Sequence, residues 1–382
     1  MHIGLIHMRH APVGGTELVL HRVARHLAEQ DHEVTIVCRS HADPPHPAVR
    51  FEVLRAPVFG SAWRMWAFAK DVERHAAQGR YDVTLGLGKT WSHDVIRAGG
   101  GSHRTYLQLA APHAGARWER RLGATALKDR LAIAIEERAF APGAYRRVIA
   151  NSRMVRDDLR RRYAIPEDDI EVVYNGVDLE RFHPRNRERG AKLRTALGIA
   201  PAQFVVLFVG NGFGRKGLAR LLDAMPALLG TRPGARLVVV GRDSDRATYE
   251  RRARELGVDG AVLFLGERRD VEVCHAMADL YCLPTWYDSF AFTIAEALAG
   301  GVPVVTTQLA GAAELVDHGV HGAVLRGEAT AEELGLALGE WAVDGRARDA
   351  GPAARSRSER YSIAASLEAV ERILLEVAAA PA

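Results

Sequence analysis

The residues best suited to bind an anion lie at 210–217, in the segment Gly-Asn-Gly-Phe-Gly-Arg-Lys-Gly. This segment follows an apolar run typical of a strand and precedes a predicted helix. Glycines let a ligand approach the backbone closely, and the adjacent cations Arg215 and Lys216, next to Gly214, suit a diphosphate. The spacing is not that of a Walker A loop, and no acidic residue is placed as in a dinucleotide fingerprint. We therefore predict a phosphate site of another kind, and two surface cations beside a turn are the alternative.

A second chemically suggestive segment is 284–305, where a strand end runs into a predicted helix. The first turn of such a helix can direct N–H groups at a phosphate. Asp288 and Glu296 lie eight residues apart, about 800° of helix rotation, so their carboxylates would share one face if the segment were wholly helical. Each carboxylate could also be a helix-terminus charge or a solvated side chain.

Two glycine-rich loops in the first half are weaker signals. Gly14 and Gly15 close the first strand-to-helix loop, where bare N–H groups can bind a phosphate or a hydroxyl, although a plain tight turn is the alternative. The glycines at 99–101 precede His103, whose imidazole titrates near neutrality and can donate to a sugar hydroxyl or a phosphate. The chain holds sixteen histidines, so a surface or structural role for His103 is the competing interpretation.

Alternating strand and helix patterns position these loops. In the first half we expect strands at 2–7, 33–38, 81–88, 146–152 and 170–178, and helices at 16–30 and 127–141. From about residue 201 the pattern restarts, with strands at 204–210, 235–241, 261–266, 279–285 and 302–307, and helices at 218–229 and 292–299. This alternation is typical of an α/β protein with parallel sheets covered by helices. We predict two Rossmann-like, doubly wound domains whose strand ends face a central cleft.

The expected domain limits follow from the same pattern. The first domain covers 1–185 and the second 186–358, with 359–382 a helix that crosses back to the first. The stretch 182–203 carries proline and charge but little apolar pattern, which is typical of a linker with a short helix.

Composition limits the class of protein. Of 382 residues, 48% are hydrophobic and 26% charged, which favours a soluble globular protein over a disordered or coiled-coil one. No apolar run approaches the roughly 18 residues of a spanning helix, and the amino terminus lacks the apolar core of a signal peptide, so we expect a cytoplasmic protein. The three cysteines form no CxxC pair, which favours buried thiols over disulfides or structural zinc. We expect no bound metal.

Charge is uneven along the chain. The net charge is +4, and residues 1–190 hold 30 Lys and Arg against 23 Asp and Glu. Aromatic residues stand beside cations in two stretches, 62–70 and 104–130. These aromatic residues are Trp63, Trp66 and Phe68 in the first stretch and Tyr106 and Trp118 in the second. Such stretches suit an anionic membrane surface, and a solvated arginine face with a buried aromatic core is the alternative.

Several motifs taken together resemble family 4 of the retaining glycosyltransferases, which have the GT-B fold. The motifs are Arg215-Lys216, the Asp288-x7-Glu296 pair, GGVPVVTT at 300–307, VIANSRMVRDDL at 148–159 and VVYNGVDLERFHP at 172–184. They cover nearly the whole chain in the family's order. Within the family, GNGFGRKGLARLLDAM and AGGGSH resemble the enzymes that add the first glucose to the heptose of the lipopolysaccharide core.

The resemblance implies roles for the residues of the second half. Arg215 and Lys216 would neutralise the leaving diphosphate of the donor. Backbone groups of Phe292 and Thr293 would bind the same phosphates. Glu296 would accept hydrogen bonds from the ribose hydroxyls.

Other implied roles involve the transferred sugar, the base and the first domain. Asp288 would accept from hydroxyls of the transferred sugar, and main-chain groups near Arg268 and Arg269 would hold the base. Gly14 and Gly15 would bring the amino-terminal domain onto the donor. His103 would lie beside the reacting sugar carbon.

The sequence departs from the family pattern at two positions. The first acid of the pair is usually glutamate and is here Asp288, which is one methylene shorter. The small glycine that follows this acid in the family is here Ala291, which would narrow the phosphate pocket.

The resemblance implies a retaining, metal-independent hexosyltransferase without a cofactor. It would move a glucose-like hexose from a UDP-sugar to a hydroxyl of a cell-envelope glycan or glycolipid such as the lipopolysaccharide core, acting in the cytoplasm or at the inner face of the membrane. Nucleic acid is not an expected partner. The alternatives are a nucleotide-sugar epimerase of the same fold and a catalytically idle nucleotide-binding module.

Overall fold

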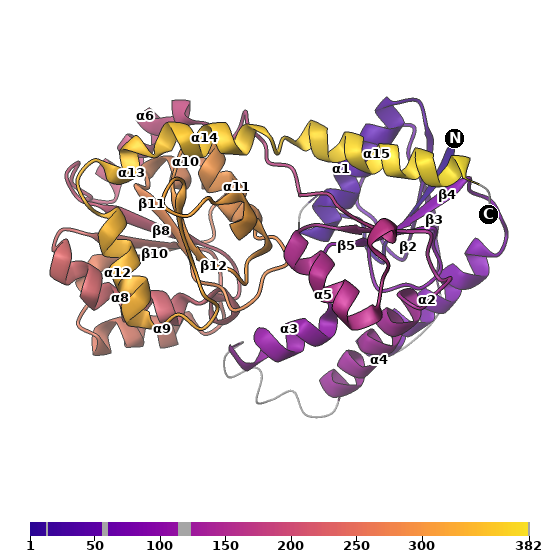
Figure 1. Ribbon diagram of the computed structural model, residues 1–382, viewed down its shortest axis with the longest axis horizontal. Coiled ribbons are helices and arrows are strands. Elements are labelled where there is room, and N and C mark those ends of the chain that lie inside the picture. Colours follow the sequence, from indigo (N-terminus) through magenta and orange to yellow (C-terminus); the bar gives the residue numbers. More distant parts are fainter. Residues whose placement is uncertain (13, 56–59, 114–123, 381–382) are drawn as a thin grey trace. The chain divides into compact units, whose positions relative to one another are not determined.

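The structure is a computed structural model that describes residues 1–12, 14–55, 60–113 and 124–380. The chain divides into two compact units (Figure 1). The first unit comprises Met1–Leu107, Glu119–Tyr174 and Ala364–Ala382, and the second comprises Gln108–Trp118 and Asn175–Ile363. The chain leaves the first unit after Tyr174, whereas the sequence analysis placed the boundary after residue 185.

The first unit is built on a seven-stranded sheet with the order β3-β2-β1-β4-β5-β6-β7, and its strands pair in parallel. The strands are β1 His2–Ile6, β2 Glu33–Cys38, β3 Arg50–Val53, β4 Val83–Gly86, β5 Val95–Ala98, β6 Arg147–Ala150 and β7 Ile170–Val172. The helices are α1 Thr16–Glu29, α2 Ser61–Ala76, α3 His103–Leu109, α4 Ala124–Ala139, α5 Arg153–Tyr163 and α15 Ile363–Ala379. Central strands are buried on both faces, as is usual for parallel sheets.

Helix α15 is part of the first unit although it is the last helix of the chain. Its apolar residues Ile373 and Leu374 are fully buried in the same core as Leu20 and Leu27 of α1. The carboxylate of Glu371 on α15 also lies within hydrogen-bond distance of two histidine rings near α1. The apolar stripe of α15 is therefore covered by the first unit.

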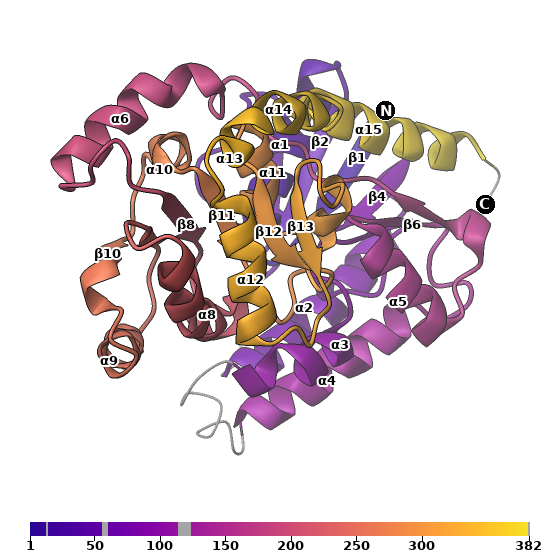
Figure 2. The ribbon, with the colours of Figure 1, turned by 60° about the vertical axis from the view of Figure 1, so that its left-hand side comes forward.

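The second unit contains a six-stranded parallel sheet with the order β10-β9-β8-β11-β12-β13 (Figure 2). The strands are β8 Val205–Val209, β9 Arg236–Val240, β10 Val262–Gly266, β11 Leu280–Leu283, β12 Val304–Thr307 and β13 Gly322–Leu325. The helices are α6 Arg187–Ala196, α7 Phe213–Lys216, α8 Leu218–Thr231, α9 Arg246–Glu255, α10 Val271–Met277, α11 Phe292–Ala299, α12 Ala331–Trp341, α13 Arg346–Asp349 and α14 Gly351–Glu359. The prediction of two doubly wound parallel-sheet domains is confirmed.

The segment 182–203 contains the predicted short helix, α6, but it belongs to the second unit and does not form a separate linker. Its helix α6 packs against α10, and a Cβ at Gly190 would lie only 2.4 Å from the carbonyl of Ala276. Because Gly190 has no Cβ, the two helices can approach closely, a contact that the charge-rich sequence of α6 does not indicate.

The strand order reverses between two neighbouring strands in each sheet. These neighbours are β1 and β4 in the first unit and β8 and β11 in the second. Ligands of open α/β sheets bind outside the carboxyl ends of the strands at such switch points. The loops that follow these four strands are thus the expected positions of ligand sites.

The three cysteines are free and buried, which confirms the prediction of buried thiols. Among the described residues, no helix is both long and apolar enough to cross a membrane.

Candidate functional site

The loop after β8 contains a one-turn helix, α7, between two glycines in left-handed conformation. Gly212 has φ 73° and Gly217 has φ 80°. A Cβ at Gly217 would lie 1.9 Å from the carbonyl oxygen of Pro284, so only glycine allows the loops after β8 and β11 to meet there. The sequence predicted a glycine-rich loop here, and the tight packing explains why glycine is required.

Arg215 and Lys216 on α7 meet the carboxylate of Asp288, which comes from the loop after β11. Lys216 Nζ donates to Asp288 Oδ2 in a short ion pair, and Arg215 Nη1 lies 3.1 Å from the same oxygen. Backbone contacts join the loops as well, since the carbonyl of Arg215 accepts from the N–H of Trp286 and from the hydroxyl of Thr285, both at 3.0 Å. Residues about seventy positions apart in sequence thus form one cluster at the switch point.

Burial sets the electrostatics of this cluster. The side chain of Lys216 is 10% exposed and that of Asp288 is 14% exposed. Burial lowers the pKa of Lys216 below its ordinary value, while the adjacent Asp288 acts in the opposite direction. Burial also tends to raise the pKa of Asp288, but Lys216 and Arg215 outweigh it and hold that pKa well below its usual range. Asp288 is therefore a carboxylate at neutral pH.

Asp288 does not lie on the helix that carries Glu296. Helix α11 begins at Phe292, and Ala291 before it has φ 67°, in the left-handed region. The condition under which the two carboxylates would share one helix face, a wholly helical segment, is therefore not met. Asp288 Oδ1 instead accepts from the N–H groups of Phe290 at 3.2 Å and Ala291 at 2.7 Å, which stabilises the turn.

We expect Ala291→Gly to leave the free energy of unfolding unchanged or raise it by up to about 1 kcal/mol. Relief of a left-handed conformation, worth roughly 1–2 kcal/mol, is partly offset by the greater chain entropy of unfolded glycine. As a matched control, Ala247→Gly on the exposed face of α9 should lower stability, because Ala247 is helical. Denaturant unfolding of both variants tests this, and an equal loss in both would contradict it.

The first turn of α11 presents Phe292 and Thr293 at the same edge of the sheet. The first N–H groups of a helix have no partner within the helix and can bind an anion. The hydroxyl of Thr293 is held in place, since the buried Tyr281 hydroxyl donates to it at 2.6 Å. The position predicted for this helix start is confirmed.

Glu296 projects from the second turn of α11, with 23% of its side chain exposed. Its carboxylate contributes to the electrostatic field at Lys216 and lies 3.8 Å from Nε2 of His275. His275 is fully buried on α10, and burial lowers its pKa to about 3, so the ring is neutral. A negative carboxylate thus stands beside the cluster of Arg215, Lys216 and Asp288.

Arg268 and Arg269 lie in the loop between β10 and α10, also at the carboxyl edge of this sheet. Arg268 forms a two-pronged contact with Asp270 at 2.6 and 2.9 Å. The carbonyl of Arg269 accepts from Arg181 at 2.9 Å. The loop after this strand is therefore held by local ion pairs and hydrogen bonds.

The remaining predicted site residues, Gly14, Gly15 and His103, belong to the first unit. Gly14 has φ 105°, and Gly15, which follows it, is the N-cap of α1. His103 begins α3, and its ring lies 3.0 Å from the carboxylate of Asp129. Burial lowers the pKa of His103, and Asp129 opposes that shift.

A buried carboxylate that the sequence analysis missed organises the segment before α3. Glu136 of α4 accepts from Ser102 Oγ at 2.8 Å, from the N–H of His103 at 2.8 Å and from Lys89 at 3.0 Å. Burial opposes the charge of Glu136, but Lys89 and the hydrogen bonds outweigh it and lower its pKa. Lys89 directly follows the strand pattern at 81–88, and a cation at a strand end was the available signal.

The described residues contain no group of three or more His, Cys, Asp and Glu side chains that could hold a metal ion. Asp243 and Asp245 have the DxD spacing that often marks a metal site. Asp243 instead accepts from the N–H groups of Phe213 at 2.6 Å and Asp245 at 2.8 Å, which stabilises the start of α7.

Two models of known protein families match this chain, one in each half. Residues 191–357 match the family model described as glycosyl transferases group 1, and residues 13–181 match the model described as glycosyltransferase family 4. The second half of the chain is thus a glycosyltransferase group 1 domain, and the first half is a glycosyltransferase family 4 domain. The predicted resemblance to glycosyltransferases is therefore confirmed.

Two curated relatives of this glycosyltransferase differ in how much of each chain is matched. The lipopolysaccharide glucosyltransferase WaaG of Escherichia coli is 27% identical over 335 residues, which is 86% of either chain. The D-inositol 3-phosphate glycosyltransferase of Nocardia farcinica is 34% identical over 207 residues, which is 51% of this chain and 45% of that enzyme. The match thus spans about half the length of the Nocardia enzyme.

Solved structures confirm the predicted GT-B fold of this glycosyltransferase. The crystal structure of WaaG, a glycosyltransferase involved in lipopolysaccharide biosynthesis, superposes with a TM-score of 0.80 at 23% identity, covering 97% of this chain and 99% of that one. Anabaena HepE in complex with UDP and glucose gives a TM-score of 0.70 at 22% identity, covering 98% and 99%.

Proposed function

We propose that this glycosyltransferase moves a glucose-like hexose from a UDP-sugar to a hydroxyl of a cell-envelope glycan or glycolipid, with retention of anomeric configuration. The observation that carries the proposal is the cluster of Arg215, Lys216 and Asp288 at the switch point of the second sheet. Supporting it, E. coli WaaG is named for glucosyl transfer to lipopolysaccharide, and HepE was crystallised with UDP and glucose.

The chemistry requires the glycosidic C–O bond to the diphosphate to break as negative charge grows on the leaving oxygen. Cations held in a partly buried site stabilise that charge without reorganising at the moment of reaction. Arg215 and Lys216 supply two positive charges, and the N–H groups of Phe292 and Thr293 supply helix-terminus donors. The acceptor hydroxyl then bonds to the sugar carbon on the same face, and its proton passes to the leaving phosphate.

The other site residues bind and orient the donor. Glu296 accepts from the ribose hydroxyls, and main-chain groups near Arg268 and Arg269 hold the base. Asp288 accepts from Lys216 and Arg215 and from two backbone N–H groups, so it fixes the direction of both cations. Accepting from a sugar hydroxyl is a further role for its carboxylate. His103, Gly14 and Gly15 are the first unit's contribution to the reacting sugar.

A panel of UDP-, GDP- and ADP-sugars tests this function, with nucleotide release followed for each. UDP release from one UDP-hexose, stimulated by a glycan or glycolipid acceptor, is the expected result. Conversion of the UDP-sugar into an epimer without acceptor would favour the epimerase alternative. Binding of UDP without any release from UDP-sugars would favour an idle nucleotide-binding module.

We expect EDTA to leave sugar transfer largely unchanged, because Arg215 and Lys216 oppose the charge of the diphosphate where other enzymes use a divalent ion. The measurement is the initial rate of UDP release with and without EDTA at fixed ionic strength. A complete loss that magnesium or manganese restores would contradict the proposed role of these cations.

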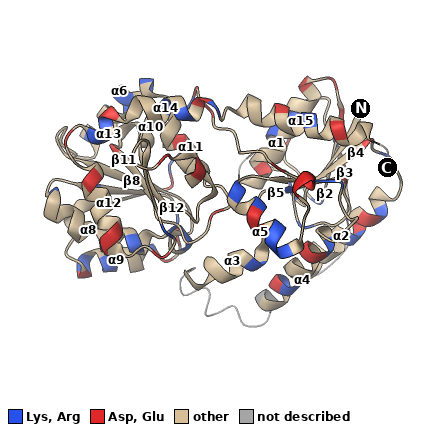
Figure 3. Cartoon of the chain, in the orientation of Figure 1, with Lys and Arg blue, Asp and Glu red and all other residues tan. Residues whose placement is uncertain are grey.

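We also propose that the first unit contacts an anionic membrane surface. Trp63 on α2 is 51% exposed, and Arg64 beside it is exposed too, whereas Phe68 of the same helix is core. Cations and anions both occur along α2, α4 and α5 (Figure 3). Attraction to the membrane would therefore come from a few local cations rather than from a surface of uniform positive charge. Trp118 of the second stretch lies outside the described residues.

Sedimentation with anionic vesicles should detect this contact at low salt. Each Arg or Lys at such a surface contributes on the order of 1 kcal/mol, so Trp63→Ser with Arg64→Glu should weaken binding several-fold. Arg251→Glu, at an exposed site in the second unit, is the matched control and should have little effect. If the unaltered protein ignores anionic vesicles, the acceptor reaches the enzyme in solution and the surface proposal is wrong.

A further inference from the structure

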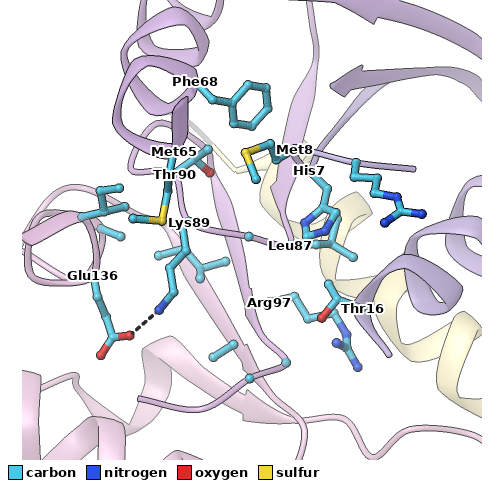
Figure 4. A pocket seen from close by; sticks show the side chains of 18 of the residues that line it. His7, Met8, Thr16, Met65, Phe68, Leu87, Lys89, Thr90, Arg97 and Glu136 are labelled. Atoms are coloured by element: carbon cyan, nitrogen blue, oxygen red, sulfur yellow. Dashed lines mark hydrogen bonds and ion pairs between the residues drawn. The ribbon is translucent and has the colours of Figure 1, made fainter. Parts of the chain in front are cut away.

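A cavity of about 360 Å³ lies in the first unit, at the carboxyl ends of its central strands (Figure 4). His7 follows β1, Leu87 follows β4 and Arg97 lies on β5, and all three line the cavity. The sheet order reverses between β1 and β4, which is where open α/β sheets bind ligands. The volume lies within the roughly 300–1,000 Å³ of small-molecule sites.

The part of the cavity between α2 and α4 is apolar. Met65 and Phe68 of α2 line this part. Ile135 and Ala139 of α4 line it from the other helix, together with Phe140 directly after α4. These side chains are buried, with Phe68 at 1% and Ile135 at 0% exposure. Protein interiors contain few voids larger than a water molecule, and an apolar cavity stays dry and takes up apolar molecules. This part of the cavity therefore suits an apolar group.

Polar side chains lie along the rest of the lining. In Figure 4, Arg97 and Thr16 lie together away from Phe68, and Lys89 reaches Glu136 on another side. The backbone of 99–101 lines the same part, directly before His103. A ligand here would have a polar portion beside the proposed site residues of the first unit and an apolar portion between the helices.

We infer that this cavity binds an apolar group of the sugar acceptor, an alkyl or aryl substituent close to the hydroxyl that receives the sugar. The inference rests on the proposed function, because it assigns the acceptor to this unit. A wholly polar acceptor would leave the apolar faces of Met65, Phe68 and Ile135 against water or empty space, with no gain from their burial. An amphipathic acceptor uses both parts of the lining.

The direct test is calorimetry on the full chain without nucleotide, using methyl, hexyl and octyl β-glucosides below their micelle concentrations. Affinity should rise about fourfold per methylene until the chain fills the cavity. Phenyl β-glucoside is a separate probe in the same experiment. If it binds as tightly as hexyl β-glucoside, the natural occupant of the cavity is a ring rather than an alkyl chain. Equal affinity across the whole series would overturn the inference.

A variant that fills the cavity tests whether octyl glucoside binds there. Ala139→Leu places a larger side chain in the cavity and should lower octyl glucoside affinity at least tenfold, with UDP affinity unchanged. Ala126→Leu, at an exposed position of the same helix, is the matched control and should bind as the unaltered protein does. Octyl glucoside binding that is unaffected by Ala139→Leu would contradict the location.

A second measurement needs no substitution and so does not depend on the variant folding. With 13C-methyl methionine labelling, octyl glucoside should shift the NMR signals of Met8 and Met65, which line the cavity, and not those of Met225 and Met277 in the second unit. Shifts confined to Met225 or Met277 would overturn the inference. Because no nucleotide is present, this result and the nucleotide-release result can fail independently.

Discussion

Replacing Lys216 or Arg215 by alanine should lower kcat/KM for sugar transfer by about 10- to 100-fold or more. Charge-assisted hydrogen bonds contribute roughly 1.5–3 kcal/mol each, and these two cations face charge that grows only as the donor bond breaks. Lys216 should show the larger effect, since its side chain is 10% exposed against 29% for Arg215 and solvent screens it less. Initial rates at several UDP-sugar concentrations separate kcat from KM.

Matched controls are available in the same unit. Lys192→Ala on α6 and Arg251→Ala on α9 each remove an exposed cation whose ion-pair partner lies on its own helix. Both should retain normal kinetics. Near-normal activity in Lys216→Ala and Arg215→Ala alike would remove the basis for the phosphate site.

The pH profile gives a second readout of Lys216. Burial lowers the pKa of this ammonium group, so the charged form that opposes the diphosphate is lost at a lower pH than for an exposed lysine. Activity should therefore fall on the alkaline side before the ordinary lysine range, and this limb should be absent from the residual activity of Lys216→Ala.

Glu296→Gln should weaken binding of both UDP and UDP-sugar by about 10-fold or more, because a carboxylate that accepts from two ribose hydroxyls contributes charge-assisted hydrogen bonds. Asp288→Asn should leave UDP affinity within a few-fold and lower mainly kcat. The amide oxygen still accepts from the backbone N–H groups. Because the amide is neutral, it no longer neutralises Lys216 and Arg215, and it no longer offers a charged acceptor to the hydroxyls of the sugar. Calorimetry with UDP and with the UDP-sugar separates the two effects.

The control for these variants is Glu188→Gln, whose side chain is 81% exposed on α6. Thermal unfolding must accompany the binding data, since Asp288→Asn leaves the buried Lys216 without its carboxylate and should lower the melting temperature. If both site variants weaken UDP to the same extent, the proposed division between ribose and sugar recognition is wrong.

The sequence alone was enough to predict the two parallel-sheet units and most of their strands. The reason is that central strands of a parallel sheet are buried on both faces and read as short apolar runs bounded by loops. The strands it missed are atypical in this respect. β3 at Arg50–Val53 and β13 at Gly322–Leu325 are partly exposed edge strands, and β5 carries the buried Arg97 in its short run.

The sequence alone was also enough to predict the cations of the candidate site. Arg215 and Lys216 lie within a few residues of two glycines that adopt positive φ, so one short window of sequence contained both the backbone shape and the charge. The eight-residue spacing between Asp288 and Glu296 was misleading about their arrangement. Ala291, which has a left-handed backbone conformation, separates Asp288 from the helix that carries Glu296.

Only the tertiary structure decided which groups act together. Asp288 reaches Lys216 because β8 and β11 are neighbours in the sheet. The apolar part of the cavity exists because α2 and α4, which are distant in sequence, pack against each other and both contribute to its lining. Glu136 shows the same dependence, since its partners Lys89 and Ser102 come from other segments. Residue types and local periodicity specify elements, whereas strand order and helix packing bring together side chains that no window of sequence connects.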